Sequence, residues 1–261
     1  MTTALRVEGL VKDFGGLRAV DGLSFNVEEG RMVGLIGPNG CGKSTTFNCI
    51  SGLLDKTAGK VEIFGSDATK MPPHRINSLG MTRTFQHTRL WREMTVIENL
   101  LLPPRQQFSP SRLMALFRPK SRPKEGERLK RAWEVLEILE ITHMAHNLSA
   151  ELSGGQSKLV DIGRAMMGES RLLLLDEPVA GVAGPLAARI FQHLRHLVET
   201  EGLTLLIIEH NMDFILQAGV DSIVVMDNGG LLMQGTPDEV RASEEVVRAY
   251  LGGDGSEEEQ E

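Results

Sequence analysis

The run GPNGCGKST has the residue types and spacing of a loop that cradles phosphates. Its three glycines can adopt backbone angles that turn successive amide N–H groups toward an anion at a helix N-terminus. Lys43 adds a positive charge for the outer phosphates, and Ser44 offers a hydroxyl to Mg²⁺. We therefore predict a nucleoside triphosphate site whose members are Gly37, Pro38, Asn39, Gly40, Cys41, Gly42, Lys43, Ser44 and Thr45.

Two adjacent carboxylates stand at the end of an apolar run. Leu172–Leu175 is followed by Asp176 and Glu177. At such a strand end one carboxylate can hold a metal, and the next can polarise a water molecule. Further along, the apolar run Leu203–Ile208 leads to His210. This histidine is either part of the same site or a buried histidine whose hydrogen bonds are satisfied.

The segment LSGGQ is a third candidate, although five residues alone are a weak signal. A helix that begins there presents amide donors and a serine hydroxyl to an anion. The residues concerned are Ser153, Gly154, Gly155 and Gln156. A further side-chain amide comes from Gln86, at the end of the predicted strand segment Thr84–Gln86.

Short apolar runs that alternate with helical patterns are typical of a buried parallel sheet with crossover helices. The sequence therefore predicts the α/β class. Strands are predicted at Leu5–Val11, Ala19–Val27, Arg31–Ile36, Lys60–Phe64, Leu172–Leu175, Leu203–Ile208 and Ile223–Met226. Between Phe85 and Arg171 we expect a helical insert without strands, with helices at Thr95–Leu102, Gly126–Glu140 and Ser153–Met167. The proline-rich stretch Pro103–Lys124 should be loop or short helix.

Composition limits the class of protein. With 261 residues, 41% of them hydrophobic, the chain can bury the core of one large domain. Its apolar stretches fall far short of the roughly 20 residues that a membrane-spanning helix needs. The N-terminal residues do not resemble a secretory signal, and two cysteines do not make a disulfide framework, so we expect a cytoplasmic protein. Cys41 and Cys49 are inert small residues or, beside bound phosphates, oxidation-sensitive thiols.

The charge distribution argues against a nucleic-acid partner. The last eight residues, DGSEEEQE, carry −5 of the net charge of −7 and leave −2 for the rest, which shows no basic stripe. This tail, residues 252–261, is predicted to be disordered. The stretch Arg112–Arg131 holds eight Arg or Lys residues. It is either a solvated loop and helix face or a contact for anionic lipid headgroups.

Taken together and in order, GPNGCGKST, Gln86, LSGGQ, LLLLDEP and His210 resemble the ATP-binding-cassette (ABC) ATPases over residues 4–251. The resemblance implies a single cassette, 1–251: residues 1–86 and 171–251 form a P-loop NTPase (RecA-like) parallel-sheet core with an N-terminal antiparallel β subdomain. Residues 87–170 form an inserted α-helical subdomain with the signature motif. ATP and Mg²⁺ are the implied cofactors.

The resemblance also assigns roles to individual residues. Lys43 contacts phosphate, Ser44 and Gln86 are magnesium or water contacts, and Asp176 is a metal carboxylate. Glu177 becomes the general base and His210 the sensor of the γ-phosphate. Phe14 occupies the place where the family stacks adenine on an aromatic ring, with ordinary core packing as the alternative. In this family the LSGGQ segment completes the site of a second subunit, which implies a homodimer or a heterodimer with a sister ATPase.

Several segments are more specifically similar to the ATPase subunits of branched-chain amino acid importers: FGGLRAVDGLSF, RTFQHTRLWREMTVIENLL, DEPVAGV, IIEHNMDFI and QGTPDEVRASEEVVRAYLG. That similarity implies membrane permease subunits as partners, a solute-binding protein as an indirect one, and a peripheral location on the cytoplasmic face of the membrane. Leu90 and Trp91 are candidates for permease docking, with packing inside the helical insert as the equal alternative.

Three positions depart from the family pattern. Ala183 stands where Asp or Asn usually senses the other site, and Leu159, beside Lys158, replaces an arginine. The subfamily also more often reads LPYGQ than LSGGQ. Two other functions therefore stay open: a soluble ABC ATPase of DNA repair or translation, and a nucleotide sensor that hydrolyses weakly. The first usually carries two cassettes or a long coiled coil, whereas this chain has one cassette and no sustained heptads.

Overall fold

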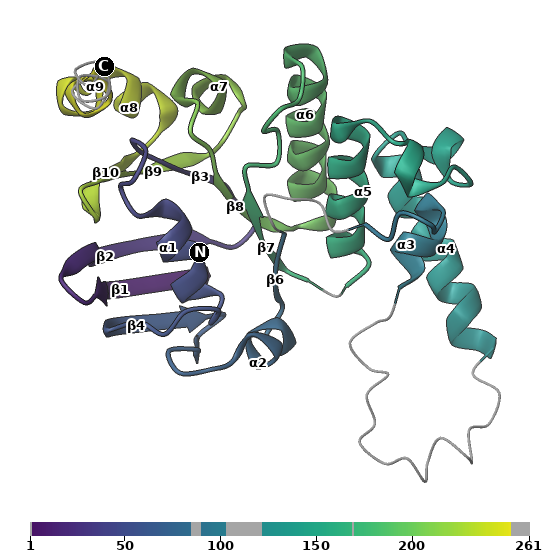
Figure 1. Ribbon diagram of the computed structural model, residues 1–261, viewed down its shortest axis with the longest axis horizontal. Coiled ribbons are helices and arrows are strands. Elements are labelled where there is room, and N and C mark those ends of the chain that lie inside the picture. The colour runs from purple at the N-terminus through teal and green to yellow at the C-terminus, as the bar shows by residue number, and fades with distance from the viewer. Residues whose placement is uncertain (1, 85–89, 103–121, 169, 252–261) are drawn as a thin grey trace, which may run out of the picture. The chain divides into compact units, whose positions relative to one another are not determined.

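The computed structural model describes residues 2–84, 90–102, 122–168 and 170–251 (Figure 1). The chain divides into two compact units. The sheet unit comprises Met1–Gln86, Arg171–Pro178 and Leu194–Glu261, and the helical unit comprises His87–Ser170 and Val179–His193.

The sheet unit contains an antiparallel sheet of four strands in the order β2-β1-β4-β5 (Figure 1). The strands are β1 (Thr3–Phe14), β2 (Leu17–Glu28), β4 (Ala58–Ile63) and β5 (Ser66–Asp67). Along β2, buried and exposed residues alternate from Leu23 to Glu28, as expected for a sheet with one face in the core. Its buried side chains, with Phe25 among them, belong to the main hydrophobic core.

A second sheet of six strands has the order β10-β9-β3-β8-β7-β6. Its strands are β3 (Met32–Ile36), β6 (Met81–Arg83), β7 (Leu172–Asp176), β8 (Thr204–Ile208), β9 (Ser222–Asp227) and β10 (Gly230–Gly235). All neighbours are parallel except β10, which runs antiparallel to β9. Every residue of β3, β7 and β8 is buried, which explains their continuous apolar runs. Because these strands are parallel, the residues that follow them meet at one edge of the sheet.

Short helices accompany these sheets: α1 (Lys43–Ile50), α2 (Pro73–Ser78), α7 (Met212–Gln217), α8 (Pro237–Ala242) and α9 (Glu244–Leu251). Helix α1 contacts β1 and β2, and its Phe47 and Ile50 are fully buried in the core. This packing anchors the helix that follows the phosphate loop, so the loop is carried by rigid elements on both sides.

The helical unit contains α3 (Val96–Leu101), α4 (Arg122–Ile138) and α5 (Gly154–Met166), with the 3₁₀ turns η2 (Thr142–Met144) and η3 (Ser149–Glu151). Helix α6 (Gly184–Glu201) begins in this unit and ends in the sheet unit. A Cβ added at Gly163 of α5 would lie 3.0 Å from Leu100 and 3.1 Å from Leu139 and Val135. The glycine thus permits close packing inside the unit.

The predicted fold class is confirmed, with four corrections. The main sheet is mixed rather than purely parallel, because β10 returns antiparallel beside β9. Strands β5 and β10 were not predicted, and the strand segment expected at Thr84–Gln86 is instead β6 at Met81–Arg83, with Thr84 outside it. Helix α4 begins at Arg122, inside the predicted linker Pro103–Lys124, because Pro123 stands in the first turn, where a missing N–H costs no hydrogen bond. Among the described residues, no helix combines the length and the apolar character needed to cross a bilayer.

Candidate active site

The loop between β3 and α1 requires glycine for steric as well as conformational reasons. Gly37, Gly40 and Gly42 have φ angles of 153°, 79° and 101°. A Cβ on Gly37 would lie 2.2 Å from the carbonyl oxygen of Met226, and one on Gly42 would lie 2.3 Å from that of Ala19. Gly42 is also the N-cap of α1 and has no side chain with which to cap it. No side chain therefore caps the first amides of α1, and they are available to an anion such as phosphate.

Lys43 lies folded over this loop. It is 8% exposed, and its Nζ donates hydrogen bonds to the carbonyl oxygens of Gly37 at 2.6 Å and Pro38 at 2.9 Å. The next two residues face outward more, because Ser44 is exposed and Thr45 is half-buried. Asn39 and Gly40 are also exposed. The loop thus presents the Ser44 hydroxyl outward, whereas the Lys43 ammonium is turned back onto the carbonyl oxygens of the loop itself.

The two thiols near this loop match the inert alternative. Cys41 and Cys49 are both buried and free. Burial raises the pKa of the Cys41 thiol, although the nearby Lys43 ammonium opposes that effect. Burial likewise raises the pKa of Cys49. A raised pKa lowers the thiolate fraction at neutral pH, and the thiolate is the reactive form.

The strand-end residues meet at the carboxyl edge of the sheet, because β7 and β8 are neighbours. Glu177 follows β7, has a φ of 47°, and donates its amide to the carbonyl of Ile208 at 3.1 Å. Its Oε1 lies 3.8 Å from Nδ1 of His210. The side chain of His210 is 54% exposed, so the alternative of a buried histidine is wrong. Glu209, which the sequence analysis did not assign, is 1% exposed, and its Oε2 lies 3.8 Å from the same Nδ1.

Asp176, the last residue of β7, is 8% exposed. Its Oδ2 accepts a hydrogen bond of 2.8 Å from Nη2 of Arg83, a residue that the sequence analysis missed. The pair is 93 residues apart in sequence, so no local pattern could have identified it. The Asp176 carboxylate and the Ser44 hydroxyl are hard oxygen donors of the kind that Mg²⁺ takes.

A metal ion that is also bound by substrate phosphates needs few ligands from the protein. Within the described ranges, no group of three or more His, Cys, Asp or Glu residues could hold a metal ion alone. Mg²⁺ usually binds through one or two carboxylates together with substrate phosphates, so this donor set fits Mg²⁺ carried in by a nucleotide. The remaining predicted metal contact, Gln86, lies outside the described residues.

Phe14 ends β1 at the turn to β2 and is 47% exposed, so the alternative of core packing is wrong. Nζ of Lys12 lies 4.8 Å from the centre of the Phe14 ring. Its ring is thus available on the surface as a platform for a flat ligand.

In the helical unit, the LSGGQ segment forms a capped helix start. Ser153 is the N-cap of α5: its Oγ accepts the amide of Gln156 at 3.3 Å, and Oε1 of Gln156 accepts the amide of Ser153 at 2.8 Å. This reciprocal pair is a capping box. Gly154 is exposed, whereas a Cβ on Gly155 would lie 2.5 Å from Leu186. The tip is therefore rigid and its outermost residues face solvent.

Trp91 is exposed by 62%, which contradicts packing inside the helical unit for this residue, while Leu90 is half-buried. The backbone of Trp91 is nevertheless held firmly. Its amide donates to Oδ1 of the fully buried Asn99 at 2.9 Å, and its carbonyl accepts from Nδ2 of Asn99 at 3.0 Å. An exposed indole on a fixed backbone has the character of an interface anchor.

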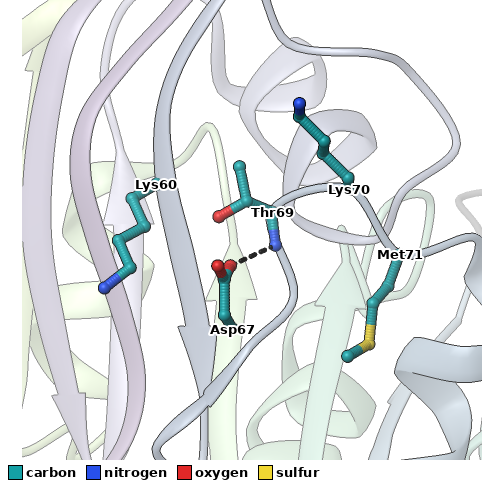
Figure 2. A pocket seen from close by; sticks show the side chains of 5 residues that line it. All are labelled: Lys60, Asp67, Thr69, Lys70 and Met71. Atoms are coloured by element: carbon teal, nitrogen blue, oxygen red, sulfur yellow. Dashed lines mark hydrogen bonds between the residues drawn. The ribbon is translucent and has the colours of Figure 1, made fainter.

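A surface hollow of about 480 Å³ lies elsewhere, on the antiparallel sheet (Figure 2). Its lining residues are Lys60, Asp67, Thr69, Lys70 and Met71. Oδ1 of Asp67 accepts the amide of Thr69 at 2.9 Å, which closes a local turn. None of the predicted site residues lines this hollow, so the candidate site rests on the loops at the strand ends.

Comparison with known proteins agrees with this geometry. A family model described as "ABC transporter" matches residues 20–180, and one described as "Branched-chain amino acid ATP-binding cassette transporter" matches residues 231–256. The probable branched-chain amino acid transport ATP-binding protein LivG of Methanocaldococcus jannaschii is 42% identical over 254 residues, which cover 95% of this chain and 97% of that protein.

Two solved structures are also similar. An ATP-binding cassette of an ABC transporter in its ADP conformation superposes with a TM-score of 0.83 at 41% identity, covering 97% of this chain and 100% of that one. A dimeric bacterial ABC transporter cassette superposes with a TM-score of 0.72 at 26% identity, covering 89% and 98% of the two chains.

Proposed function

The chain belongs to the ATP-binding proteins of ABC transporters, of the branched-chain amino acid (LivG) type, and from this premise we propose how its residues bind and hydrolyse ATP to power import. The observation that carries the proposal is the meeting of Glu177 and His210, 3.8 Å apart, at the sheet edge that also carries the glycine loop. Residues 1–251 then act as one cassette.

In the proposed mechanism the triphosphate binds on the loop of residues 37–45. The ammonium of Lys43 leaves the carbonyl oxygens of Gly37 and Pro38 and binds phosphate oxygens instead. This exchange requires only that the Lys43 side chain changes its rotamer. The ring of Phe14 stacks on the base, since it already lies exposed at the end of β1. Binding thus uses groups that the fold holds in place before the nucleotide arrives.

Hydrolysis is assigned to the strand ends. Glu177 accepts a proton from the attacking water, and His210 contacts the γ-phosphate. Ser44, Asp176 and Gln86 would hold Mg²⁺, which would neutralise charge on the phosphate oxygens when bound. The positive φ of Glu177 supports this role, because strained backbone is kept where the surrounding structure uses it.

The active unit is proposed to be a dimer, formed with a second copy or with a sister ATPase. Ser153 and Gly154 lie exposed at a helix start, and the hydroxyl hydrogen of Ser153 can still be donated while its oxygen accepts the Gln156 amide. In the proposed dimer this tip closes the γ-phosphate site of the partner; that a related bacterial cassette is dimeric supports the dimer itself. Binding then closes the dimer and hydrolysis reopens it.

The importer is proposed to hold this subunit at the cytoplasmic face of the membrane through its permease. Trp91, with its indole exposed and its backbone fixed by Asn99, is the proposed anchor, and Leu90 is its neighbour in the contact. A solute-binding protein delivers branched-chain amino acids to the permease and does not contact this chain. Deleting the chain should abolish ATP-driven leucine uptake by membrane vesicles, and restoring Glu177→Gln should not recover it.

The experiment that tests the site is Glu177→Gln, with the exposed Glu245→Gln as matched control. We expect ATP binding to persist, turnover to fall by roughly 10²–10⁴-fold, and light scattering to show an ATP-trapped dimer. The control should behave as the natural chain does. Unchanged turnover in Glu177→Gln would remove this residue from its role.

A specific observation favours one second candidate. Ala183 is exposed and stands where the family pattern has Asp or Asn. A chain that lacks this polar contact could bind nucleotide and signal without efficient turnover. Tight ATP binding with turnover no higher than in Glu177→Gln would establish this nucleotide-sensing alternative.

A further inference from the structure

Arg83 is the last residue of β6, and its side chain is buried. Its side chain is 8% exposed, and Arg83 pairs with Leu174 in the ladder between β6 and β7. Gln86, the proposed magnesium contact, follows three residues later. Arg83 thus stands where the main sheet leads into the site.

The first contact of Arg83 is to the proposed metal carboxylate. Its Nη2 donates to Oδ2 of Asp176 at 2.8 Å, and the side chains are 8% and 10% exposed. A charge-assisted bond to one oxygen fixes the plane of a carboxylate and leaves the second oxygen for another partner. Replacing a buried ion pair by apolar groups is often neutral for stability, so stability alone is a weak reason for this pair.

Arg83 also contacts the C-terminal end of α1 and its C-cap residue. Its Nη1 donates to Oδ1 of Asn48 at 2.7 Å and to Oγ of Ser51 at 3.2 Å, and its Cζ lies 5.5 Å from the centre of the Phe47 ring. Helix α1 begins at Lys43 and carries Ser44 in its first turn. One guanidinium therefore connects the carboxylate of β7 to the helix of the phosphate loop.

We propose that Arg83 is a positioning residue for magnesium: it orients the Asp176 carboxylate relative to Ser44 by joining β7 to α1. The inference rests on the proposed function, because it assumes that Asp176 and Ser44 serve Mg²⁺. A bidentate-capable, planar guanidinium suits this task better than lysine, since it can serve the carboxylate and the helix at once.

The test compares Arg83→Met and Arg83→Lys with Arg195→Met. Arg195 also pairs with an aspartate of the sheet unit, Asp221, at 2.9 Å, but Asp221 precedes β9 and so lies at the opposite edge of the sheet. Binding of a fluorescent ATP analogue is measured first in EDTA and then during a Mg²⁺ titration. Thermal unfolding of each variant shows whether it is folded.

We expect binding in EDTA to stay within about twofold of the natural chain, because the loop amides and Lys43 are unchanged. The Mg²⁺ concentration at half-effect should rise roughly tenfold or more in Arg83→Met, the usual loss when a partner of a metal ligand is removed. Arg83→Lys keeps the positive charge but loses the planar guanidinium, so its Mg²⁺ midpoint should lie between those of the natural chain and Arg83→Met. The midpoint of Arg195→Met should match that of the natural chain.

An unchanged midpoint in Arg83→Met would overturn the inference. A lower midpoint would overturn it as well, because that result is expected if the guanidinium merely competes with the metal for Asp176. If Arg83→Met does not fold, the midpoint of Arg83→Lys decides in the same way. If the natural chain itself shows no Mg²⁺ effect on nucleotide binding, the proposed function fails instead.

Discussion

The starts of α1 and α5 differ in how their amides are satisfied. Helix α1 follows Gly42, which has a φ of 101° and no capping side chain. Helix α5 follows Ser153, which forms a reciprocal capping box with Gln156. In the loop before α1, Gly37 and Gly42 lie too close to other backbone atoms to carry a Cβ, whereas nothing lies within 4 Å of a Cβ built on Gly154.

This difference suits the two helix starts to different kinds of contact with an anion. The α1 start has no capping side chain, so its amides are available for the direct grip on phosphate that we propose, with Lys43 beside it. The α5 start is already satisfied by its own side chains, so it is rigid without a ligand and suits a contact added from outside. The two helix starts should therefore respond differently to substitution, and matched variants at each start test this.

The largest effect is expected from Lys43→Ala. Removing the ammonium removes charge-assisted bonds worth roughly 1.5–3 kcal/mol each, so ATP affinity should fall by about a hundredfold or more. Gln156→Ala at the α5 start should leave the ATP affinity of the single chain unchanged. Equilibrium titration with ATP measures both, and micromolar affinity retained in Lys43→Ala would contradict a direct grip by α1.

Gly42→Ala should destabilise the protein, because a Cβ would lie 2.3 Å from the Ala19 carbonyl at a φ that alanine avoids. Backbone strain alone is worth about 1–3 kcal/mol in the free energy of unfolding. Gly154→Ala, the matched change at α5, should stay within about 0.5 kcal/mol. Denaturant unfolding measures the pair, and equal losses would mean that the two helix starts do not differ.

Ser153→Ala removes one half of a capping box and should cost about 1 kcal/mol of unfolding free energy. Thr236→Ala removes the equivalent half at α8, where Thr236 and Glu239 cap each other, and should cost a similar amount. Only Ser153→Ala should also weaken the ATP-dependent dimer, as followed by light scattering. Equal weakening in both variants would show that the α5 tip has no specific place in the interface.

The smallest effect concerns Asp161, inside α5. Burial raises the pKa of this carboxyl above its ordinary 3.8, although Arg164 and Lys158 oppose the shift. The folded state then binds more protons than the unfolded state, so stability falls as pH rises above 3.8 toward the raised pKa. Asp161→Asn lacks this loss, so its free energy of unfolding should rise relative to that of the natural chain as pH goes from acid to neutral.

Asp221 provides the opposite case, and urea unfolding of Asp161→Asn and Asp221→Asn at a series of pH values measures both effects. Burial would raise its pKa, but bonds from the Met32 amide and from Arg195 and Arg31 lower it overall. Its stabilising contribution is present above the unfolded pKa and is lost as pH falls through the folded pKa. Asp221→Asn should therefore lose relative stability as pH rises, and slopes of the same sign in both variants would contradict these shifts.

Local patterns predicted the parts of the site that are local in sequence. The glycine spacing before Lys43 predicted the loop, the apolar run before Asp176 predicted β7, and Ser153 was expected at a helix start, where the structure has it. Exposure of Phe14, His210 and Trp91 could not be read from these patterns, because an aromatic residue at a strand end or in a loop is compatible with either environment.

By itself, the sequence determined the class of the fold, the phosphate loop and the family, because these depend on residue types at short spacing and on apolar periodicity. Only the tertiary structure decided that Arg83 holds Asp176 and the last turn of α1, and that Glu177 and His210 meet beside a buried Glu209. These contacts join strands that are neighbours in the sheet and distant in the chain. Pairing of that kind depends on strand order, which no local spacing encodes.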